Sequence, residues 1–403
     1  MSPARIFFVN RFYWPEEPAT AQLLTDLAAS LVACGHDVTV IARRPADVDT
    51  PARAVREGVV IERVRTTRWG RRSLAGRACD FATFYWSAFF RLLRLARRGD
   101  VIVALTDPPL IGVVAWFAAG LRGAVLMHWA QDIYPEVAVE LTGHRWLLGL
   151  RPLRNLAWRR AAACVIPGAD MARTVATALH GTTRIVVSPN WAPAGVAPPP
   201  NDAVATLRHA WGLDEKFVAV YSGNLGRVHD LAPLLEVAAA LRDDPRFAFV
   251  FVGHGAQRAP LERAARARAL ANVSFHPPQP RERLAVTLAA GDVHFVTLCP
   301  GAERYVFPSK LYGIAQVGRP VIFVGRQDSE LAQLVRSHGF GEAFARDEID
   351  RIVHLLEAWR ADAAGLAARR TAALGFLPRA RADATNQWHQ LISDVLADGR
   401  RPL

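Results

Sequence analysis

The stretch from Cys299 to Pro320, CPGAERYVFPSKLYGIAQVGRP, places a charged, glycine-bearing loop between a predicted buried strand and a predicted helix. Lys310 follows Ser309 at the point where the helix should begin, so an ammonium, a hydroxyl and free backbone N–H groups would converge there. A diphosphate fits such a point. A surface loop capped by Ser309, with Lys310 in solvent, explains this segment equally well when it is taken alone.

A second strand-turn-helix pattern lies upstream, at Tyr221 to Asp230, YSGNLGRVHD. Gly223 and Gly226 would let backbone N–H groups approach a phosphate, and Arg227 would add a charged fork. A tight turn without a ligand would also use these glycines. Because Lys310 follows a later strand of the same predicted domain, the two cations should share one sheet edge, which favours a diphosphate site that requires no metal.

Other chemistries are weakly supported. Gly253 and Gly255 follow a strand, but Arg258 stands where a dinucleotide fingerprint has its third glycine. Asp47 and Asp49 lie in a proline-flanked loop without clustered partners, so we expect a solvated turn rather than a metal site. No Walker lysine loop, zinc helix motif or nucleophile elbow occurs in the sequence. We therefore expect neither a metal site nor a bound cofactor.

The composition suits a globular protein with an anionic partner. The 403 residues are 51% hydrophobic and 21% charged, enough for about two domains. The net charge of +12 favours nucleic acid, a phosphorylated ligand or an anionic membrane. The four cysteines lack paired zinc-site spacing and are expected to be buried in a reducing cytosol. No signal peptide opens the chain, and the apolar stretch from Pro108 to Leu121 is predicted to be a buried helix, too short to span a membrane.

Strand-like and helix-like segments alternate in both halves of the chain, on either side of a linker rich in proline, glycine and alanine, NWAPAGVAPPPND. This alternation predicts an α/β protein with two doubly wound domains. The expected boundaries are an amino-terminal domain at 1–190, a linker at 191–203, a carboxyl-terminal domain at 204–375 and a final amphipathic helix within 376–403.

Residues 68–98 interleave arginines with aromatic side chains. On an amphipathic helix this composition is typical of a segment that lies at a membrane interface. A helix packed on the sheet with a solvated basic face explains the pattern equally well. Single-stranded nucleic acid would use similar residues, but no nucleic-acid-binding fold signature occurs, so no nucleic-acid partner is expected.

These motifs together resemble family 4 retaining glycosyltransferases of GT-B fold, and most of all the bacterial branch that makes O-antigen, capsule and colanic-acid type polysaccharides. The similarity covers nearly the whole chain, through FYWPEEPATAQLLTDLAASLVACGHDVTVIA, TDPP, QDIYPE, SPNW, YSGNLGRVHD, FVGHG, NVSFHPPQP and PGAERYVFPSKLYGIAQVGRPVIFVG. It implies two Rossmann-like domains facing across a cleft, with a C-terminal helix packing back toward the amino-terminal domain.

The resemblance implies that the carboxyl-terminal domain binds a nucleoside-diphosphate sugar, expected to be UDP-linked. Arg227 and Lys310 would take the diphosphate, and Glu303 would face the sugar hydroxyls. The other residues expected at the donor are Gly223, Asn224, Ser309, Glu330 and, through the backbone near the base, Pro278 and Gln279. The chain departs from the family pattern at three positions, because Asn224, His229 and Gly313 replace an arginine, a lysine and the ribose-binding glutamate.

In the amino-terminal half the resemblance implies an acceptor site. Asp132 is the best candidate to contact the reacting hydroxyl, although a loop cap is an equally simple role. His128 is as often a satisfied strand-end histidine as a catalytic one. Together with Glu303, these are the residues expected closest to the chemistry, and the further acceptor-side candidates are Glu16, Glu17, Thr20 and Glu136.

The expected activity is a metal-independent, retaining transfer of a sugar to a polyprenyl-diphosphate-linked saccharide. The departing diphosphate would take the acceptor proton, so no protein base is required. The protein would be cytoplasmic and peripheral at the inner face of the membrane, with residues 68–98 on anionic lipid. Two alternatives remain, a sugar-nucleotide epimerase of the same architecture and an inactive subunit that binds membrane or a partner transferase.

Overall fold

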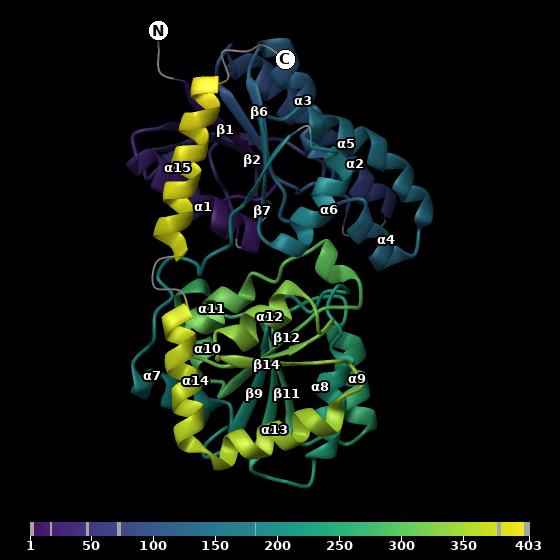
Figure 1. Ribbon diagram of the computed structural model, residues 1–403, viewed down its shortest axis with the longest axis vertical. Coiled ribbons are helices and arrows are strands. Elements are labelled where there is room, and N and C mark those ends of the chain that lie inside the picture. The colour runs from purple at the N-terminus through teal and green to yellow at the C-terminus, as the bar shows by residue number, and fades with distance from the viewer. Residues whose placement is uncertain are drawn as a thin grey trace. The chain divides into compact units, whose positions relative to one another are not determined.

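The computed structural model describes residues 4–16, 18–45, 48–70, 74–181, 183–376 and 380–398. The chain forms two compact units, each built on its own sheet (Figure 1). The first unit contains Met1–Asn190, Tyr305–Phe307 and Arg381–Leu403, and the second contains Trp191–Arg304 and Pro308–Ala380.

The first unit has an eight-stranded sheet with helices on its faces. Its strands are β1 (Arg5–Val9), β2 (Asp37–Arg43), β3 (Arg53–Arg56), β4 (Val59–Val64), β5 (Val101–Ala104), β6 (Val125–Trp129), β7 (Ala163–Ile166) and β8 (Arg184–Val187). Its helices are α1 (Ala19–Ala33), α2 (Leu74–Leu95), α3 (Ile111–Arg122), α4 (Glu136–Thr142), the 3-10 helix η1 (Arg145–Leu150), α5 (Arg151–Arg159), α6 (Ala169–Leu179) and α15 (Ala380–Asp398).

The second unit has a six-stranded, fully parallel sheet. Its strands are β9 (Phe217–Ser222), β10 (Phe247–Val252), β11 (Val273–His276), β12 (Val293–Thr297), β13 (Val321–Val324) and β14 (Gly341–Phe344). Its helices are α7 (Asn201–Ala210), α8 (Ala232–Ala240), α9 (Arg258–Ala267), η2 (Arg281–Arg283), α10 (Leu284–Ala289), η3 (Ala302–Arg304), α11 (Lys310–Gln316), α12 (Glu330–Ser337), α13 (Ile349–Ala361) and α14 (Ala363–Phe376).

Both sheets reverse their direction of winding next to their first strand. The first sheet has the order β3-β4-β2-β1-β5-β6-β7-β8, and the second has the order β11-β10-β9-β12-β13-β14. The chain therefore winds outward from β1 and from β9 and then returns on the other side of each strand. In such sheets the loops at the carboxyl edge separate at the reversal and leave room for a ligand. The two expected Rossmann-like folds are confirmed, and each has one such point.

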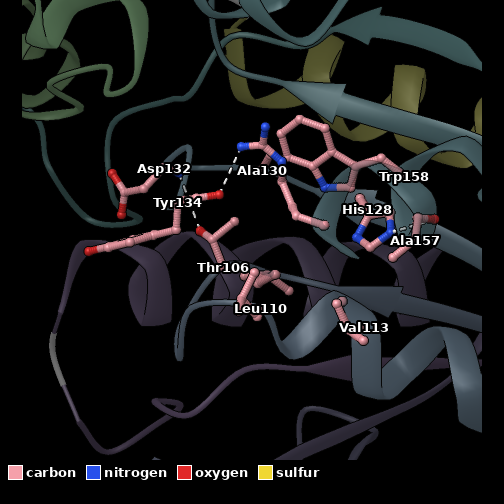
Figure 2. A pocket seen from close by; sticks show the side chains of 12 residues that line it. Thr106, Leu110, Val113, His128, Ala130, Asp132, Tyr134, Ala157 and Trp158 are labelled. Atoms are coloured by element: carbon pink, nitrogen blue, oxygen red, sulfur yellow. Dashed lines mark hydrogen bonds between the residues drawn. The ribbon is translucent and has the colours of Figure 1, made fainter. Parts of the chain in front are cut away.

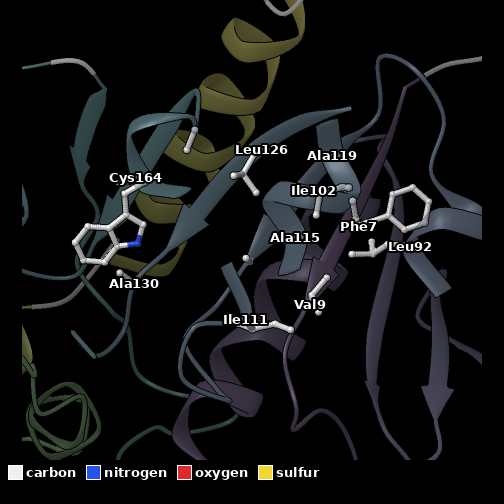
Figure 3. Packing of buried hydrophobic residues seen from close by; sticks show 14 of the residues in the cluster. Phe7, Val9, Leu92, Ile102, Ile111, Ala115, Ala119, Leu126, Ala130 and Cys164 are labelled. Carbon is white, nitrogen blue, oxygen red and sulfur yellow. The ribbon is translucent and has the colours of Figure 1, made fainter. Parts of the chain in front are cut away.

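The strands read as continuous apolar runs because both faces of each sheet are covered. In the first unit Phe7, Ile102 and Leu126 pack against helical side chains that include Leu92 and Ala115 (Figure 3). On the other face α15 places the Trp388 ring 5.0 Å from that of Trp129 and 6.2 Å from that of Phe8. The C-terminal helix thus packs on the first sheet, as the resemblance implied.

Three details differ from the sequence-based expectations. Strand β3 was not predicted, and it pairs with β4 antiparallel through a two-residue turn at Glu57 and Gly58, both of positive φ. Helix α3 is buried on one face only, because Phe117 is 52% and Leu121 is 68% exposed. Of the four cysteines only Cys164 is buried. Among the described residues, no helix combines the length and the apolar character needed to cross a membrane.

Candidate active site

The carboxyl edge of the second sheet is built from glycine loops in close contact. A Cβ on Gly253 would lie 2.0 Å from the Gly223 carbonyl oxygen, and one on Gly255 would lie 2.4 Å from the Leu225 oxygen. The Leu225 N–H donates to the carbonyl of His254 at 2.8 Å. The loops after β9 and β10 therefore pack backbone against backbone, so the glycines that suggested a nucleotide fingerprint are needed for this packing.

The loop after β12 is tied to the loop after β9. The N–H of Cys299 donates to the Val228 carbonyl at 2.8 Å, and the imidazole of His229 hydrogen-bonds the Thr297 carbonyl at 2.7 Å. Burial, followed by the charge of Lys310, lowers the pKa of His229 to about 3. This histidine, which stands where the family has a lysine, is therefore a neutral tie between two strand ends and supplies no charge to a ligand.

Lys310 places a cation at this edge. Its Nζ donates to the Tyr221 hydroxyl at 2.6 Å and lies 3.8 Å from the centre of the Tyr221 ring. A Cβ on Gly223 would lie 3.3 Å from Nζ, so the glycine leaves room for the ammonium. Desolvation lowers the pKa of Lys310 to about 7. Lys310 is thus half-buried against Tyr221 rather than extended into solvent, which argues against the simple surface-loop interpretation.

Lysine is rare in this chain, which makes its position informative. The sequence has only two lysines, Lys216 and Lys310, and all its other basic residues besides histidine are arginine. An ammonium is compact and can lose its proton when it is desolvated, whereas a guanidinium stays charged. The site at Lys310 therefore accommodates a small cation that a ligand can charge.

The remaining donor-side candidates follow strands of the same sheet, at its carboxyl edge. Arg227 and Asn224 are exposed on the β9 loop, and the Asn224 carbonyl accepts from the Tyr221 hydroxyl at 2.9 Å. Ser309 is the N-cap residue of α11, but its hydroxyl caps no backbone N–H. After the edge strand β11, Pro278 is exposed and Gln279 donates to the Pro277 carbonyl at 3.0 Å.

Glu303 has one unsatisfied oxygen. The residue is 4% exposed, and its Oε1 accepts from the Arg326 N–H at 3.0 Å. Its Oε2 is buried and has no hydrogen-bond partner among the described residues. A buried acceptor without a donor is costly, so a ligand hydroxyl at Oε2 would be favourable.

Gly313, which stands where the resemblance implies a ribose-binding glutamate, lies close to a neighbouring helix. Gly313 lies inside α11, and a Cβ there would stand 3.3 Å from Leu288 Cδ1. A side chain at this position would require Leu288 of α10 to shift. Glu330 begins α12 at the end of the neighbouring strand β13, after the N-cap Ser329.

In the first unit a pocket opens at the carboxyl ends of β5 and β6. It is lined by Leu105, Thr106, Leu110, Gly112, Val113, His128, Ala130, Asp132, Tyr134, Arg154, Ala157 and Trp158. Asp132 and Tyr134 lie at one end and His128 at the other (Figure 2). The pocket therefore has an acidic end and an end closed by a histidine.

Asp132 is the titratable group of this pocket. Burial, followed by the charge of Asp107, raises the pKa of Asp132 to about 7. Its backbone N–H donates to the Thr106 hydroxyl at 3.3 Å, and its carboxyl caps no backbone N–H among the described residues. A carboxyl of this kind can exchange a proton near neutral pH.

His128 forms a wall of the pocket. It is 2% exposed, its Nε2 lies 3.4 Å from the Ala157 carbonyl, and burial lowers its pKa to about 4. A Cβ on Gly112 would lie 2.2 Å from the imidazole. The imidazole is therefore neutral at physiological pH and held between α3 and α5.

Two of the acceptor-side carboxylates are engaged in ion pairs. Glu136 is buried and pairs with Arg154 at 2.7 Å and with Arg151 at 2.8 Å, so it clamps α4 to α5. Glu16 pairs with Arg43 at 2.5 Å. Thr20 lies in the first turn of α1, and Glu17 lies outside the described residues.

The sequence reasoning missed Asp107, which lies in the TDPP loop after β5 and pairs with Arg11 at 2.9 Å. Burial raises the pKa of Asp107, and its charge helps to raise that of Asp132. The TDPP motif itself was the available signal. In the described part of the chain no group of three His, Cys, Asp or Glu residues could hold a metal ion, and Asp47 lies outside that part.

Comparison with known proteins matches both halves of the chain. Residues 20–191 match the Glycosyl transferase 4-like domain, and residues 204–371 match the Glycosyl transferases group 1 model. An Escherichia coli protein named colanic acid biosynthesis glycosyl transferase WcaI is 37% identical over 38% of this chain and 37% of its own length. A Pseudomonas aeruginosa protein named as the glycosyltransferase WbjE is 26% identical over 84% of this chain and 85% of its own length.

A solved structure extends the match to the fold. HepE of Anabaena, in complex with UDP, aligns with a TM-score of 0.71 at 15% identity over 97% of this chain and all of its own. This likeness concerns the fold. Because both domain models match in order and the chain forms two Rossmann-like units, it belongs to the family 4 glycosyltransferases of GT-B fold.

Proposed function

We propose that this protein transfers a sugar from a UDP-sugar to a polyprenyl-diphosphate-linked saccharide, with retention of configuration and without a metal ion, in bacterial surface polysaccharide synthesis. The names of WcaI and WbjE support this setting, and the UDP bound to HepE supports the donor class. The observation that carries the proposal is the desolvated ammonium of Lys310 among glycine loops at the carboxyl edge of the second sheet.

Lys310 and Arg227 act on the diphosphate. A diphosphate next to Lys310 would favour the charged form of the ammonium and would itself be stabilised as a leaving group. Arg227, exposed on the β9 loop, adds a fork that suits phosphate oxygens. Two cations can supply the charge that a divalent metal would otherwise provide.

Glu303 and Asp132 act on the two sugars. The unsatisfied Oε2 of Glu303 accepts from a hydroxyl of the donor sugar and so fixes the position of the anomeric carbon. Asp132 accepts from the reacting hydroxyl of the acceptor and orients it. The bond from the anomeric carbon to the diphosphate oxygen breaks, and a bond to the acceptor oxygen forms on the same face. The acceptor proton passes to the departing diphosphate.

The lipid-linked acceptor places the enzyme at the inner face of the cell membrane, as a peripheral protein. Support comes from residues 68–98, of which the described part exposes Trp69, Trp86 and Phe90 together with several arginines. Residues 71–73, which include two of the predicted arginines, lie outside the described part of the chain.

The test incubates the full chain with UDP-glucose, UDP-galactose or UDP-N-acetylglucosamine and a polyprenyl-diphosphate saccharide, with and without a metal chelator. Product analysis by NMR should show the same anomeric configuration in donor and product, and the chelator should have no effect. An inverted product or a chelator-sensitive reaction would contradict the proposed mechanism. Conversion of the donor in the absence of any acceptor would instead indicate an epimerase.

A further inference from the structure

Arg227 lies in a four-residue turn whose two ends are joined by one side chain from another loop. The His229 N–H donates to the Gly226 carbonyl at 3.1 Å, so Arg227 and Val228 occupy the two central positions of this turn. The Nε2 amide group of Gln257 donates to the Gly226 carbonyl at 2.5 Å and to the His229 carbonyl at 2.7 Å. We call residues 226–229 the Arg227 turn, and Gln257 therefore bridges its first and last residues.

Gln257 reaches the Arg227 turn from the loop after β10, which runs alongside it. The backbone N–H of Gln257 donates to the Leu225 carbonyl at 3.0 Å, and the Leu225 N–H donates to the His254 carbonyl at 2.8 Å. Gly255 makes this approach possible, because a Cβ there would lie 2.4 Å from the Leu225 oxygen. The backbone contact between the two loops thus brings the Gln257 side chain to the turn.

The side chain of Gln257 does not serve its own helix. Gln257 is the N-cap residue of α9, a position at which Ser, Thr, Asp or Asn commonly accepts a hydrogen bond from a backbone N–H of the first turn. The Gln257 side chain makes no such capping bond. Its hydrogen bonds to the Arg227 turn are therefore not a by-product of helix capping.

A second loop also donates to the backbone of the Arg227 turn. The thiol of Cys299, after β12, donates to the Arg227 carbonyl at 3.3 Å, and the Cys299 N–H donates to the Val228 carbonyl at 2.8 Å. Each carbonyl from Leu225 to His229 therefore accepts a hydrogen bond from the loop after β10 or from the loop after β12. The backbone on which Arg227 stands is held at every residue.

The Arg227 side chain differs from its backbone in this respect. It is exposed, and within the part of the chain that the structure describes its guanidinium has no hydrogen bond or ion pair. A ligand that binds a mobile loop must also fix that loop, which lowers the affinity. A turn that is closed before binding avoids this loss. A fixed backbone with a free guanidinium is thus the arrangement that favours binding of an anion.

We propose that Gln257 is a positioning residue, which closes the Arg227 turn and so holds the Arg227 guanidinium in place for the diphosphate of the donor. This inference rests on the proposed function, because it takes the diphosphate as the ligand of Arg227. Gln257 itself does not contact the ligand. Its effect on binding passes through Arg227, so the loss of Gln257 should matter only while Arg227 is present.

The first test is calorimetric titration of the full chain with UDP and with uridine. Gln257→Met should weaken UDP binding about tenfold, because the two hydrogen bonds that close the turn are lost, and should leave uridine binding unchanged. Gln257→Glu keeps the shape of the side chain but cannot donate at neutral pH, so it should weaken UDP binding as well. Wild-type affinity for UDP in both variants would overturn the proposal, as would an equal loss for UDP and uridine.

A double-mutant cycle distinguishes positioning from a general structural role. Arg227→Met removes the group through which Gln257 is proposed to act. In that background Gln257→Met should cause no further loss of UDP affinity, because the two changes affect the same interaction. If Gln257→Met weakens UDP binding by the same factor with and without Arg227, Gln257 does not act through Arg227 and the proposal is wrong.

Gln387→Met is the matched control. Gln387 lies on α15 in the first unit and, like Gln257, donates from its side chain to a backbone carbonyl, that of Val187, at 3.1 Å. This variant loses the same kind of hydrogen bond but should bind UDP with wild-type affinity. An equal loss of UDP affinity in the Gln387 and Gln257 variants would assign the effect to general destabilisation and contradict the proposal.

Amide hydrogen exchange in the free protein separates this inference from the proposed function. The His229 amide closes the Arg227 turn, and in Gln257→Met it should exchange about tenfold faster than in the wild type. Unchanged exchange at His229 would show that Gln257 does not hold the turn. If the wild-type chain binds no UDP, the proposed function fails, whereas exchange at His229 still decides whether Gln257 closes the turn.

Discussion

Each of the two sheets has a candidate substrate site at its carboxyl edge, but one site carries a cation and the other carries carboxyl groups. At the carboxyl edge of the second sheet the glycine loops, the half-buried ammonium of Lys310 and the neutral His229 form a site that suits an anion. At the carboxyl edge of the first sheet Asp107 and Asp132 lie close enough that the charge of one raises the pKa of the other. The fold supplies both edges, and a few side chains decide that one suits a diphosphate and the other a hydroxyl.

The largest expected effect is a loss of donor affinity when Lys310, at the carboxyl edge of the second sheet, is replaced. Lys310→Met should weaken UDP-sugar binding about a hundredfold, because a hydrogen bond from a partly desolvated ammonium to a charged oxygen contributes up to about 3 kcal/mol. Calorimetric titration measures the change. Lys216→Met removes the other lysine, which lies outside this site, and should leave the affinity unchanged. Equal affinities for the two variants would show that Lys310 does not contact the donor.

The next prediction concerns Asp132, at the carboxyl edge of the first sheet, and distinguishes its role from that of Lys310. Asp132→Asn should lower the transfer rate at saturating substrates by about tenfold to a hundredfold and leave donor affinity unchanged, because the amide orients the acceptor hydroxyl less well. The dependence of the transfer rate on pH shows which form of Asp132 acts in the reaction. The pKa of Asp132 is raised to about 7, so the ionised form and the wild-type rate should increase as the pH rises through that value.

The Asp132→Asn variant should lack this rise, and Asp37→Asn, at an exposed position on β2, should keep it. A wild-type profile that is flat through neutral pH would remove Asp132 from the reaction. A loss of donor affinity in Asp132→Asn would contradict the assignment of the donor to the second sheet and of the acceptor to the first.

A smaller effect tests the glycine loops. Gly223→Ala should weaken donor binding about tenfold, because the residue has a φ of +132° and the added Cβ would stand 3.3 Å from the Lys310 ammonium. Gly339→Ala is the matched control, since its φ is +69° and no heavy atom lies within 4 Å of its Cβ position. Both variants should lose about 1 kcal/mol of stability, but only Gly223→Ala should bind the donor less tightly. The same loss of affinity in both would assign the effect to general destabilisation.

Much of the fold was readable from the sequence because doubly wound sheets bury both faces and so produce continuous apolar strands separated by helices. The cluster of glycines after β9 also predicted the position of the candidate donor site at the carboxyl edge of the second sheet. The sequence could not show that Gly253 touches the Gly223 backbone or that Leu288 closes the space beside Gly313, because these contacts join residues far apart in the chain. The ion pairs of Glu136 and the exposed side of α3 escaped prediction for the same reason.

The central claim is that the second sheet holds the diphosphate of the donor, and a comparison of UDP with uridine tests it most directly. Calorimetric titration of the full chain should show UDP binding about a hundredfold more tightly than uridine, because only UDP engages the ammonium of Lys310. The pKa of Lys310 is about 7 in the free protein, so UDP affinity should fall as the pH rises above that value. Uridine affinity should stay constant over the same range. Equal affinities for UDP and uridine, or UDP binding that is independent of pH, would contradict the account.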